Sequence, residues 1–229
     1  MTRALVLELV GPAGAGKTAV AAALRRRDPS IRSVTRVRQL RHLPQLLRAV
    51  AGALTPASLD LPRRGLVDVR RSARYLVRLR SLYSLASREA AHGGRAVILD
   101  EGPVFAAAML RGAAPVGRLA AACTAALRAW AGTLDAIVWL DAPDPILTAR
   151  IAARHKAHEL KGRDTDAASV VLTQHRRWLR ESVALLAAHA PVWTVEFRTD
   201  GEPADRIADR IFEAITSPVR TPLALGVCG

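Results

Sequence analysis

The chain has 229 residues, of which 50% are hydrophobic, 24% are charged and only 4% are aromatic. This composition suits one globular domain with a mainly aliphatic core, and it excludes a disordered chain and two independent domains of ordinary size. The net charge is +14, and residues 24–95 carry +13 of it through 17 arginines against four acids.

The first elements are an apolar run at residues 4–10, which predicts a buried strand, and strong helix-forming sequence at residues 19–24. Between them stands a full match to the phosphate-binding P-loop pattern G-x-x-x-x-G-K-S/T: Gly11, Pro12, Ala13, Gly14, Ala15, Gly16, Lys17 and Thr18. Glycines let backbone N–H groups approach phosphate oxygens, and the N-terminus of the following helix adds partial positive charge. We expect Lys17 to reach the β- and γ-phosphates of a nucleoside triphosphate, and the Thr18 hydroxyl to ligate Mg²⁺.

The N-terminus superficially resembles a signal peptide, with Arg3 followed by an apolar stretch. Because Glu8 and the P-loop interrupt that stretch, we expect no signal peptide. No apolar segment approaches the roughly 18 to 20 residues that span a bilayer. The only two cysteines, Cys123 and Cys228, fit neither a disulfide framework nor a metal cluster. We therefore expect a cytoplasmic protein.

The basic segment, residues 24–95, comes next. Apolar pieces within residues 39–50, separated by Pro44, predict short helices, residues 52–65 predict a connection, and a longer helix is expected from about Leu66 to Ala91. That helix should end at Gly93-Gly94. Its expected packing stripe is Val69, Ala73, Leu76, Tyr83 and Ala90.

The same helix carries a row of like charges at spacing i, i+4, i+8, namely Arg70, Arg74 and Arg78. Such a row is mildly unfavourable unless an anion or acids lie nearby. Two interpretations of the basic segment stay open. It is a surface for an anionic ligand, or it reflects a composition in which arginine outnumbers lysine 31 to three.

Three further apolar runs predict strands at residues 96–99, 136–140 and 192–197, and residues 203–215 predict a closing helix. The first two strands end in Asp100 and Asp141. Strands that alternate with helices indicate an α/β fold in which a parallel sheet is covered on both faces, with ligands at the carboxyl ends of the strands. The tail after Ser217 is expected to be poorly ordered.

Asp100 is the best candidate for the acid that a P-loop enzyme places near its metal, or for the carboxylate that orients an acceptor hydroxyl. A solvated turn after a strand is the alternative. Glu101 has two interpretations as well: a second acid near the metal, or an ion-pair partner for an arginine of the basic segment.

Residues 150–166 form a cationic segment that could close over phosphates as a lid. A charged, solvent-facing helix end is the other interpretation. The spacing of His155, His158 and Glu159 matches no zinc pattern, so we interpret these residues as lid surface.

Taken together, the P-loop, Leu99-Asp100, the stretch from Trp139 to Pro145, the arginine-containing lid and the last strand and helix resemble the thymidylate kinase and deoxynucleoside kinase group. The resemblance spans nearly the whole chain. It implies a P-loop NTPase fold, a three-layer sandwich with a parallel sheet and helical acceptor and lid insertions, and it implies ATP and Mg²⁺ as cofactors.

The resemblance also implies roles for single residues. Lys17 and Thr18 would hold phosphate and Mg²⁺, with Lys17 also catalytic, and Asp100 would be the catalytic acid and a metal ligand. Arg150, Arg154 and Arg163 would be lid arginines, with Arg154 acting in catalysis and the other two in binding ATP. The loop at Thr199-Asp200-Gly201 would lie near the base.

One departure concerns the acceptor. The group typically has arginine after the strand acid, whereas this chain has Glu101-Gly102-Pro103, and few aromatic residues are present to stack on a nucleobase. Our leading hypothesis is a kinase that phosphorylates a nucleoside or nucleotide. The alternatives are a kinase for a sugar, an antibiotic or a lipid-linked intermediate, and a P-loop ATPase or binding module that docks on a polyanion or partner protein.

For domain organisation we expect one domain at residues 1–217, with residues 24–95 as a basic acceptor-site insertion, a lid at 150–166 and a flexible tail at 218–229. The expected partner is a small anionic or polar acceptor. A recognisable nucleic-acid motif with interleaved aromatics is missing, which argues against nucleic acid. The sequence is compatible with a peripheral membrane contact and with a homodimer.

Overall fold

A computed structural model provides the structure and describes residues 3–34, 66–112, 117–155 and 158–217. These residues contain a five-stranded sheet in the order β2-β3-β1-β4-β5, in which every neighbouring pair is parallel. The strands are β1 (Leu5–Val10), β2 (Arg32–Val34), β3 (Ala96–Asp100), β4 (Ala136–Asp141) and β5 (Trp193–Arg198). The predicted α/β class is confirmed.

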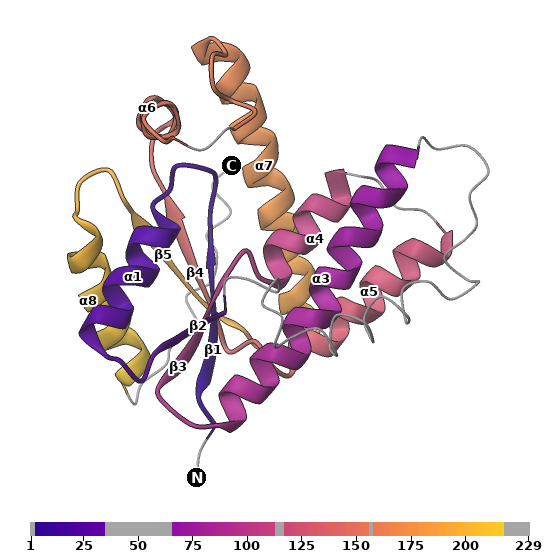
Figure 1. Ribbon diagram of the computed structural model, residues 1–229, viewed down its shortest axis with the longest axis vertical. Coiled ribbons are helices and arrows are strands. Elements are labelled where there is room, and N and C mark those ends of the chain that lie inside the picture. The colour runs from indigo at the N-terminus through magenta and orange to yellow at the C-terminus, as the bar shows by residue number, and fades with distance from the viewer. Residues whose placement is uncertain (1–2, 35–65, 113–116, 156–157, 218–229) are drawn as a thin grey trace.

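Helices cover both faces of the sheet (Figure 1). One face is covered by α1 (Lys17–Arg27) and α8 (Ala204–Thr216). The other is covered by α3 (Leu66–Ala91), α4 (Pro103–Gly112), α5 (Gly117–Ala131) and the second half of α7 (Thr165–Ala187). A short helix, α6 (Asp144–Ala152), follows β4 and packs against α7. We give α6, α7 and the loop between them the name helical hairpin.

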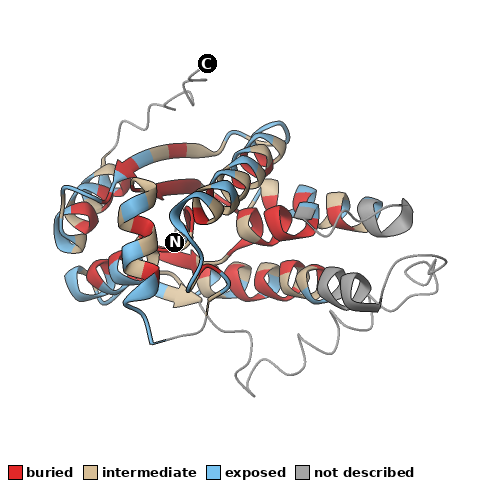
Figure 2. Ribbon diagram, turned by 90° about the horizontal axis from the view of Figure 1, so that it is seen from above, coloured by how far each residue is buried: buried red, intermediate tan, exposed pale blue. Residues whose placement is uncertain are grey.

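The central strand β1 divides the core into two layers, because successive side chains point to opposite faces of a sheet. Val6 and Val10 face the layer of α3, α4 and α5, while Leu7 and Leu9 face α1 and α8. Figure 2 shows buried central strands between helices whose outward faces are exposed. Glu8 lies between these residues and is fully buried.

The order of the strands positions the site. β1 has β3 on one side and β4 on the other, with Leu9 opposite Asp100 and Val10 opposite Trp139. Since carboxyl ends of parallel strands meet at one edge, the P-loop after β1 lies beside the acids that end β3 and β4.

Several predicted elements are confirmed with shifts of a residue or less at their ends. The long helix spans Leu66–Ala91 and is followed by Gly93 and Gly94, both at positive φ. The last strand and helix each begin and end one residue later than expected, at Trp193–Arg198 and Ala204–Thr216. The three-residue edge strand β2 and the helices α4, α5, α6 and α7 were not predicted from the sequence. In α4 and α5, small apolar residues obscure the helical period.

Parts of the basic segment belong to the common framework of sheet and helices. Residues 24–27 end α1, residues 32–34 form β2, and residues 66–91 form α3. The short helices expected at 39–50, the connection at 52–65 and the tail at 218–229 lie outside the described residues, as do the side chains of Val69, Arg70 and Ala73. Among the described helices, no stretch combines the length and apolar character that crossing a bilayer requires.

Candidate active site

The P-loop connects the carboxyl end of β1 to the first turn of α1, and two of its glycines show why the motif needs them. Gly14 has a φ of +87°, and a Cβ there would lie 2.7 Å from the Leu147 carbonyl oxygen of α6. Gly16 has a φ of +83° and forms the N-cap of α1, where a Cβ would meet no atom within 4 Å. Close packing therefore requires glycine at residue 14, whereas backbone conformation alone favours it at residue 16.

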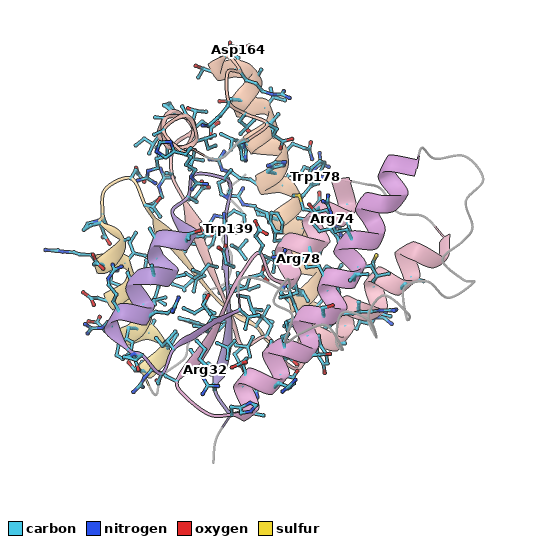
Figure 3. The ribbon with its side chains drawn as sticks, viewed as in Figure 1. Arg32, Arg74, Arg78, Trp139, Asp164 and Trp178 are labelled. Carbon is cyan, nitrogen blue, oxygen red and sulfur yellow. The ribbon has the colours of Figure 1, made fainter. Side chains whose placement is uncertain are left out.

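The N-terminus of α1 is arranged for an anion. No side chain of the described residues caps it, and its first turn contains no acid. The start of α7 is different, because the Asp164 carboxylate there accepts a hydrogen bond from the Ala167 N–H at 2.7 Å (Figure 3). The first N–H groups of a helix have no partner within the helix, and phosphate oxygens can accept from them.

Lys17 lies in the first turn of this helix, and its ammonium group donates to P-loop carbonyl oxygens of Gly11 at 2.6 Å and Pro12 at 2.9 Å. Burial lowers the pKa of Lys17 to about 8, and the Asp100 carboxylate opposes that shift. The predicted phosphate-binding lysine is thus held by the loop itself. Phosphate oxygens would replace these carbonyl contacts with charge-assisted ones.

Asp100 and Thr18, the two predicted metal ligands, lie together. The Thr18 hydroxyl donates to Asp100 Oδ2 at 3.3 Å, although 82 residues separate them in sequence. Hydroxyl and carboxylate oxygens suit Mg²⁺, and adjacent oxygens around an octahedral Mg²⁺ lie roughly 3 Å apart. The described residues contain no cluster of three or more metal-ligating side chains. The pair therefore fits a metal that takes its other ligands from water and nucleotide phosphates.

The turn after β3 is held by Arg78 of α3. Its guanidinium donates to the carbonyl oxygens of Asp100 at 3.3 Å and Glu101 at 3.0 Å, and it lies 3.1 Å from the Glu101 carboxylate. Glu101 adopts a φ of 61°, which is uncommon for a residue other than glycine. Of the two interpretations of Glu101, the structure supports the ion pair with an arginine of the basic segment.

Glu8 is a buried acid that the sequence analysis did not place in the site. One carboxylate oxygen accepts from the Val104 N–H at 2.8 Å and the other from the Phe105 N–H at 3.0 Å, so Glu8 satisfies the first turn of α4. Burial raises the pKa of Glu8 to about 8, while these hydrogen bonds and the Arg78 charge oppose the rise. A carboxyl group in the middle of a central strand was the available sequence signal, because acids rarely occupy such positions.

The lid arginines occupy different places. Arg150 of α6 donates to Thr199 Oγ1 at 2.9 Å and to the Thr199 carbonyl oxygen at 2.6 Å, and approaches the Gly14 carbonyl oxygen at 3.4 Å. It thereby joins the P-loop to the loop that was expected near the base. Arg154 is exposed, and its charge contributes to the lowered pKa of Lys17. Arg163 instead binds the Glu159 carbonyl oxygen at 2.9 Å, within the lid.

Arg176, a second functional residue that was not predicted, fixes the helical hairpin to the sheet. Arg176 of α7 pairs with Asp141 at 2.9 Å and Asp144 at 2.7 Å, and donates to the Ala142 carbonyl oxygen at 3.0 Å. Its side chain is only 17% exposed. The Asp141 carboxylate therefore serves as the ion-pair partner that attaches α7 to the end of β4.

Aromatic residues near the turn are few. Tyr75 of α3 and Phe105 of α4 meet edge to face, with ring centroids 6.3 Å apart. Tyr83 instead packs against the fully buried Trp130, so it belongs to the core. Both rings of the Tyr75–Phe105 pair are half-buried against the core, and Phe105 belongs to the first turn of α4, which follows the Asp100 turn.

Comparison with known proteins identifies the family of this chain. A family model described as "AAA domain" matches residues 6–182, which is more than half of the chain. The chain belongs to the AAA domain family. A search of curated proteins finds no match. Among solved structures, the chain is similar to shikimate kinase from Acinetobacter baumannii in complex with shikimate, with 20% identity, a TM-score of 0.47 and 93% of each chain covered.

The AAA domain match extends from β1 into α7. It includes the P-loop, Asp100, Glu8 and Arg176, whereas the loop at Thr199 follows its end. The structure therefore brings Lys17, Thr18, Asp100 and Arg150 together around the P-loop of this AAA domain. Arg163 stays within the lid, and Arg154 is an exposed lid residue whose charge acts on Lys17.

Proposed function

We propose that this AAA domain protein is an ATP- and Mg²⁺-dependent kinase for a small acceptor. The observation that carries the proposal is the pairing of Thr18 with Asp100 at 3.3 Å, beside the lysine of a complete P-loop. P-loop ATPases also hold Mg²⁺ between the loop hydroxyl and an acid of a neighbouring strand, so the pair supports metal-assisted phosphoryl chemistry, and the resemblance to the kinase group favours a kinase. A phosphoryl-transfer site needs a carboxylate next to the phosphates, for the metal or for the acceptor hydroxyl.

Each residue then has a stated task. The first N–H groups of α1 and the Lys17 ammonium bind the phosphates, and Arg154 adds positive charge from the lid. Bound Mg²⁺ would be held through Thr18 and Asp100, and it would neutralise charge on the transferring phosphoryl group. Catalysis then consists of positioning and charge stabilisation, without a covalent enzyme intermediate.

For the acceptor, we propose a nucleoside or nucleotide, on the resemblance to the thymidylate kinase and deoxynucleoside kinase group. The half-buried Tyr75–Phe105 pair, whose Phe105 lies in the first turn of the helix after Asp100, supports an acceptor with a flat ring. A specific observation favours a second candidate. The residue after the strand acid is Glu101, which is engaged by Arg78, so a sugar, an antibiotic or a lipid-linked intermediate is the alternative acceptor.

The test is ATP turnover by the purified protein with Mg²⁺ against nucleosides, nucleoside monophosphates and sugars, with products followed by mass. We expect a new phosphorylated product. Lys17→Ala should lower the rate by about 100-fold or more, because it removes the positive charge that stabilises the transferring phosphoryl group. Asp100→Asn should lose a similar factor. ATP hydrolysis without a phosphorylated product would contradict the kinase proposal and favour an ATPase or binding module.

A further inference from the structure

Glu8 occupies an unusual place for an acid. It lies in the middle of the central strand, its side chain is 0% exposed, and its neighbours on the same face of β1 are Val6 and Val10. A buried carboxyl group is costly unless its hydrogen bonds are satisfied. Both oxygens of Glu8 are satisfied, and by backbone N–H groups of the same short segment.

That segment is the first turn of α4, directly after the Asp100 turn. Gly102 completes the fit, because a Cβ on it would lie 2.7 Å from Glu8 Cδ and 2.9 Å from Oε2. Backbone at residue 102 therefore lies directly against the carboxyl group. Glu8 and Gly102 together determine how closely α4 approaches β1.

The turn is held from its other side by Arg78, which contacts the carbonyl oxygens of Asp100 and Glu101. Residues 100–102 are thus clamped between a buried acid of β1 and a half-buried arginine of α3. Asp100 meets Thr18 from this clamped turn. A shift of α4 by a fraction of an ångström would move the Asp100 carboxylate relative to the P-loop.

We propose that Glu8 is a positioning residue for the metal-nucleotide site: it holds the start of α4, through contact with Gly102, so that the Asp100 carboxylate faces Thr18. The inference rests on the proposed function only in requiring that Mg²⁺ bind with the nucleotide. It assigns Glu8 a role in addition to helix capping. The two roles affect different quantities. Loss of capping alone lowers the stability of the fold, whereas loss of positioning weakens the binding of Mg²⁺ with the nucleotide.

The test compares the affinity of wild type and Glu8→Gln for a non-hydrolysable ATP analogue, by calorimetry with Mg²⁺ and with EDTA. Carboxyl oxygens accept hydrogen bonds in either protonation state, whereas the amide nitrogen of glutamine cannot accept. One N–H of α4 therefore loses its acceptor. We expect the enhancement of affinity by Mg²⁺ to fall by about 10- to 100-fold, as for other residues that orient metal ligands. Affinity in EDTA, which depends on Lys17 and the P-loop, should change by less than about threefold.

The matched control is Val6→Ala, which truncates another fully buried side chain on the same face of β1. It should lower the unfolding midpoint and leave the enhancement by Mg²⁺ unchanged. Gly102→Ala perturbs the same contact from the side of the turn. It replaces Glu8→Gln as the test if that variant does not fold. It should reduce the enhancement in the same way, and combining the two substitutions should give less than the product of their separate effects.

The outcomes separate this inference from the proposed function. If wild type binds the analogue with a clear enhancement by Mg²⁺ and the Glu8 and Gly102 variants keep it, the positioning role is wrong and the kinase proposal stands. If wild type shows no enhancement by Mg²⁺, both fail together. If Val6→Ala loses the enhancement as Glu8→Gln does, general destabilisation explains the loss and the positioning role is wrong.

Discussion

Lys17 makes nucleotide binding by the P-loop depend on pH. In the protein without nucleotide its ammonium lies against the Gly11 and Pro12 carbonyl oxygens, and burial lowers its pKa to about 8. A phosphate beside it favours the charged form, which raises its pKa in the complex. Nucleotide binding should therefore take up a proton once the pH exceeds about 8.

This gives a prediction for the affinity of the protein for ATP. The affinity should be nearly constant below pH 8 on account of Lys17, since the group is already charged there. Above pH 8 it should weaken by up to about tenfold per pH unit, because each binding event must also protonate the lysine. Calorimetric titrations from pH 7.5 to 9.5 measure this.

Lys17→Arg is the control, because arginine stays charged across that range. Its affinity for ATP should show no comparable decline. A wild-type affinity that is flat to pH 9.5 would mean that the pKa of Lys17 is not lowered as the structure indicates.

At the scale of elements, the helical hairpin of α6 and α7 depends on one cluster of charges. Arg176 joins α7 to Asp141 at the end of β4 and to Asp144 at the start of α6. All three side chains are largely buried, so removal of the arginine would leave two carboxylates without their partner.

We predict that Arg176→Met lowers the free energy of unfolding by about 2 to 4 kcal/mol, measured by urea denaturation. The substitution leaves the partly buried carboxylates of Asp141 and Asp144 without their ion-pair partner. Arg177→Met is a matched control on the same helix. Arg177 is 72% exposed and pairs with Glu181 at spacing i, i+4. Its loss should cost about 0.5 kcal/mol or less. Equal effects of the two substitutions would show that the Arg176 cluster does not anchor α7.

At the scale of the whole molecule, acids from outside the basic segment offset part of its charge of +13. Five described arginines of the basic segment pair with acids: Arg26 with Asp205, Arg27 with Asp209, Arg32 with Glu89, Arg78 with Glu101 and Arg95 with Asp28. Two of these acids come from α8, far along the chain. For these arginines, the structure favours an ordinary ion-paired role over a surface for a polyanion.

We accordingly predict that heparin or DNA at about 0.15 M salt changes ATP turnover by less than about twofold. Any binding should be non-specific and should weaken steeply as salt rises. Turnover with and without the polyanion, over a series of salt concentrations, measures this. Stimulation of tenfold or more would instead support the docking-module alternative.

Features set by residues close together in the sequence could be predicted, whereas contacts between residues far apart in the sequence could not. The P-loop, the strand that ends in Asp100 and the helix at residues 66–91 depend on neighbours in sequence, and all three were predicted. The ion pair between Arg78 and Glu101 was one of two alternatives, because spacing alone does not say which arginine approaches. The role of Glu8 was missed, since its partners Val104 and Phe105 lie 96 and 97 residues away.

The sequence alone determined that this chain has an α/β fold with a phosphate-binding loop, because turn geometry, strand periodicity and the P-loop pattern are local properties. Tertiary structure decided what surrounds the loop. It brought Asp100 to Thr18, placed Arg78 and Glu8 on opposite sides of the Asp100 turn, and made Asp141 the partner of Arg176 instead of a free acid. The reason is physical: buried charges must find partners, and only the packing of distant elements settles which partners are within reach.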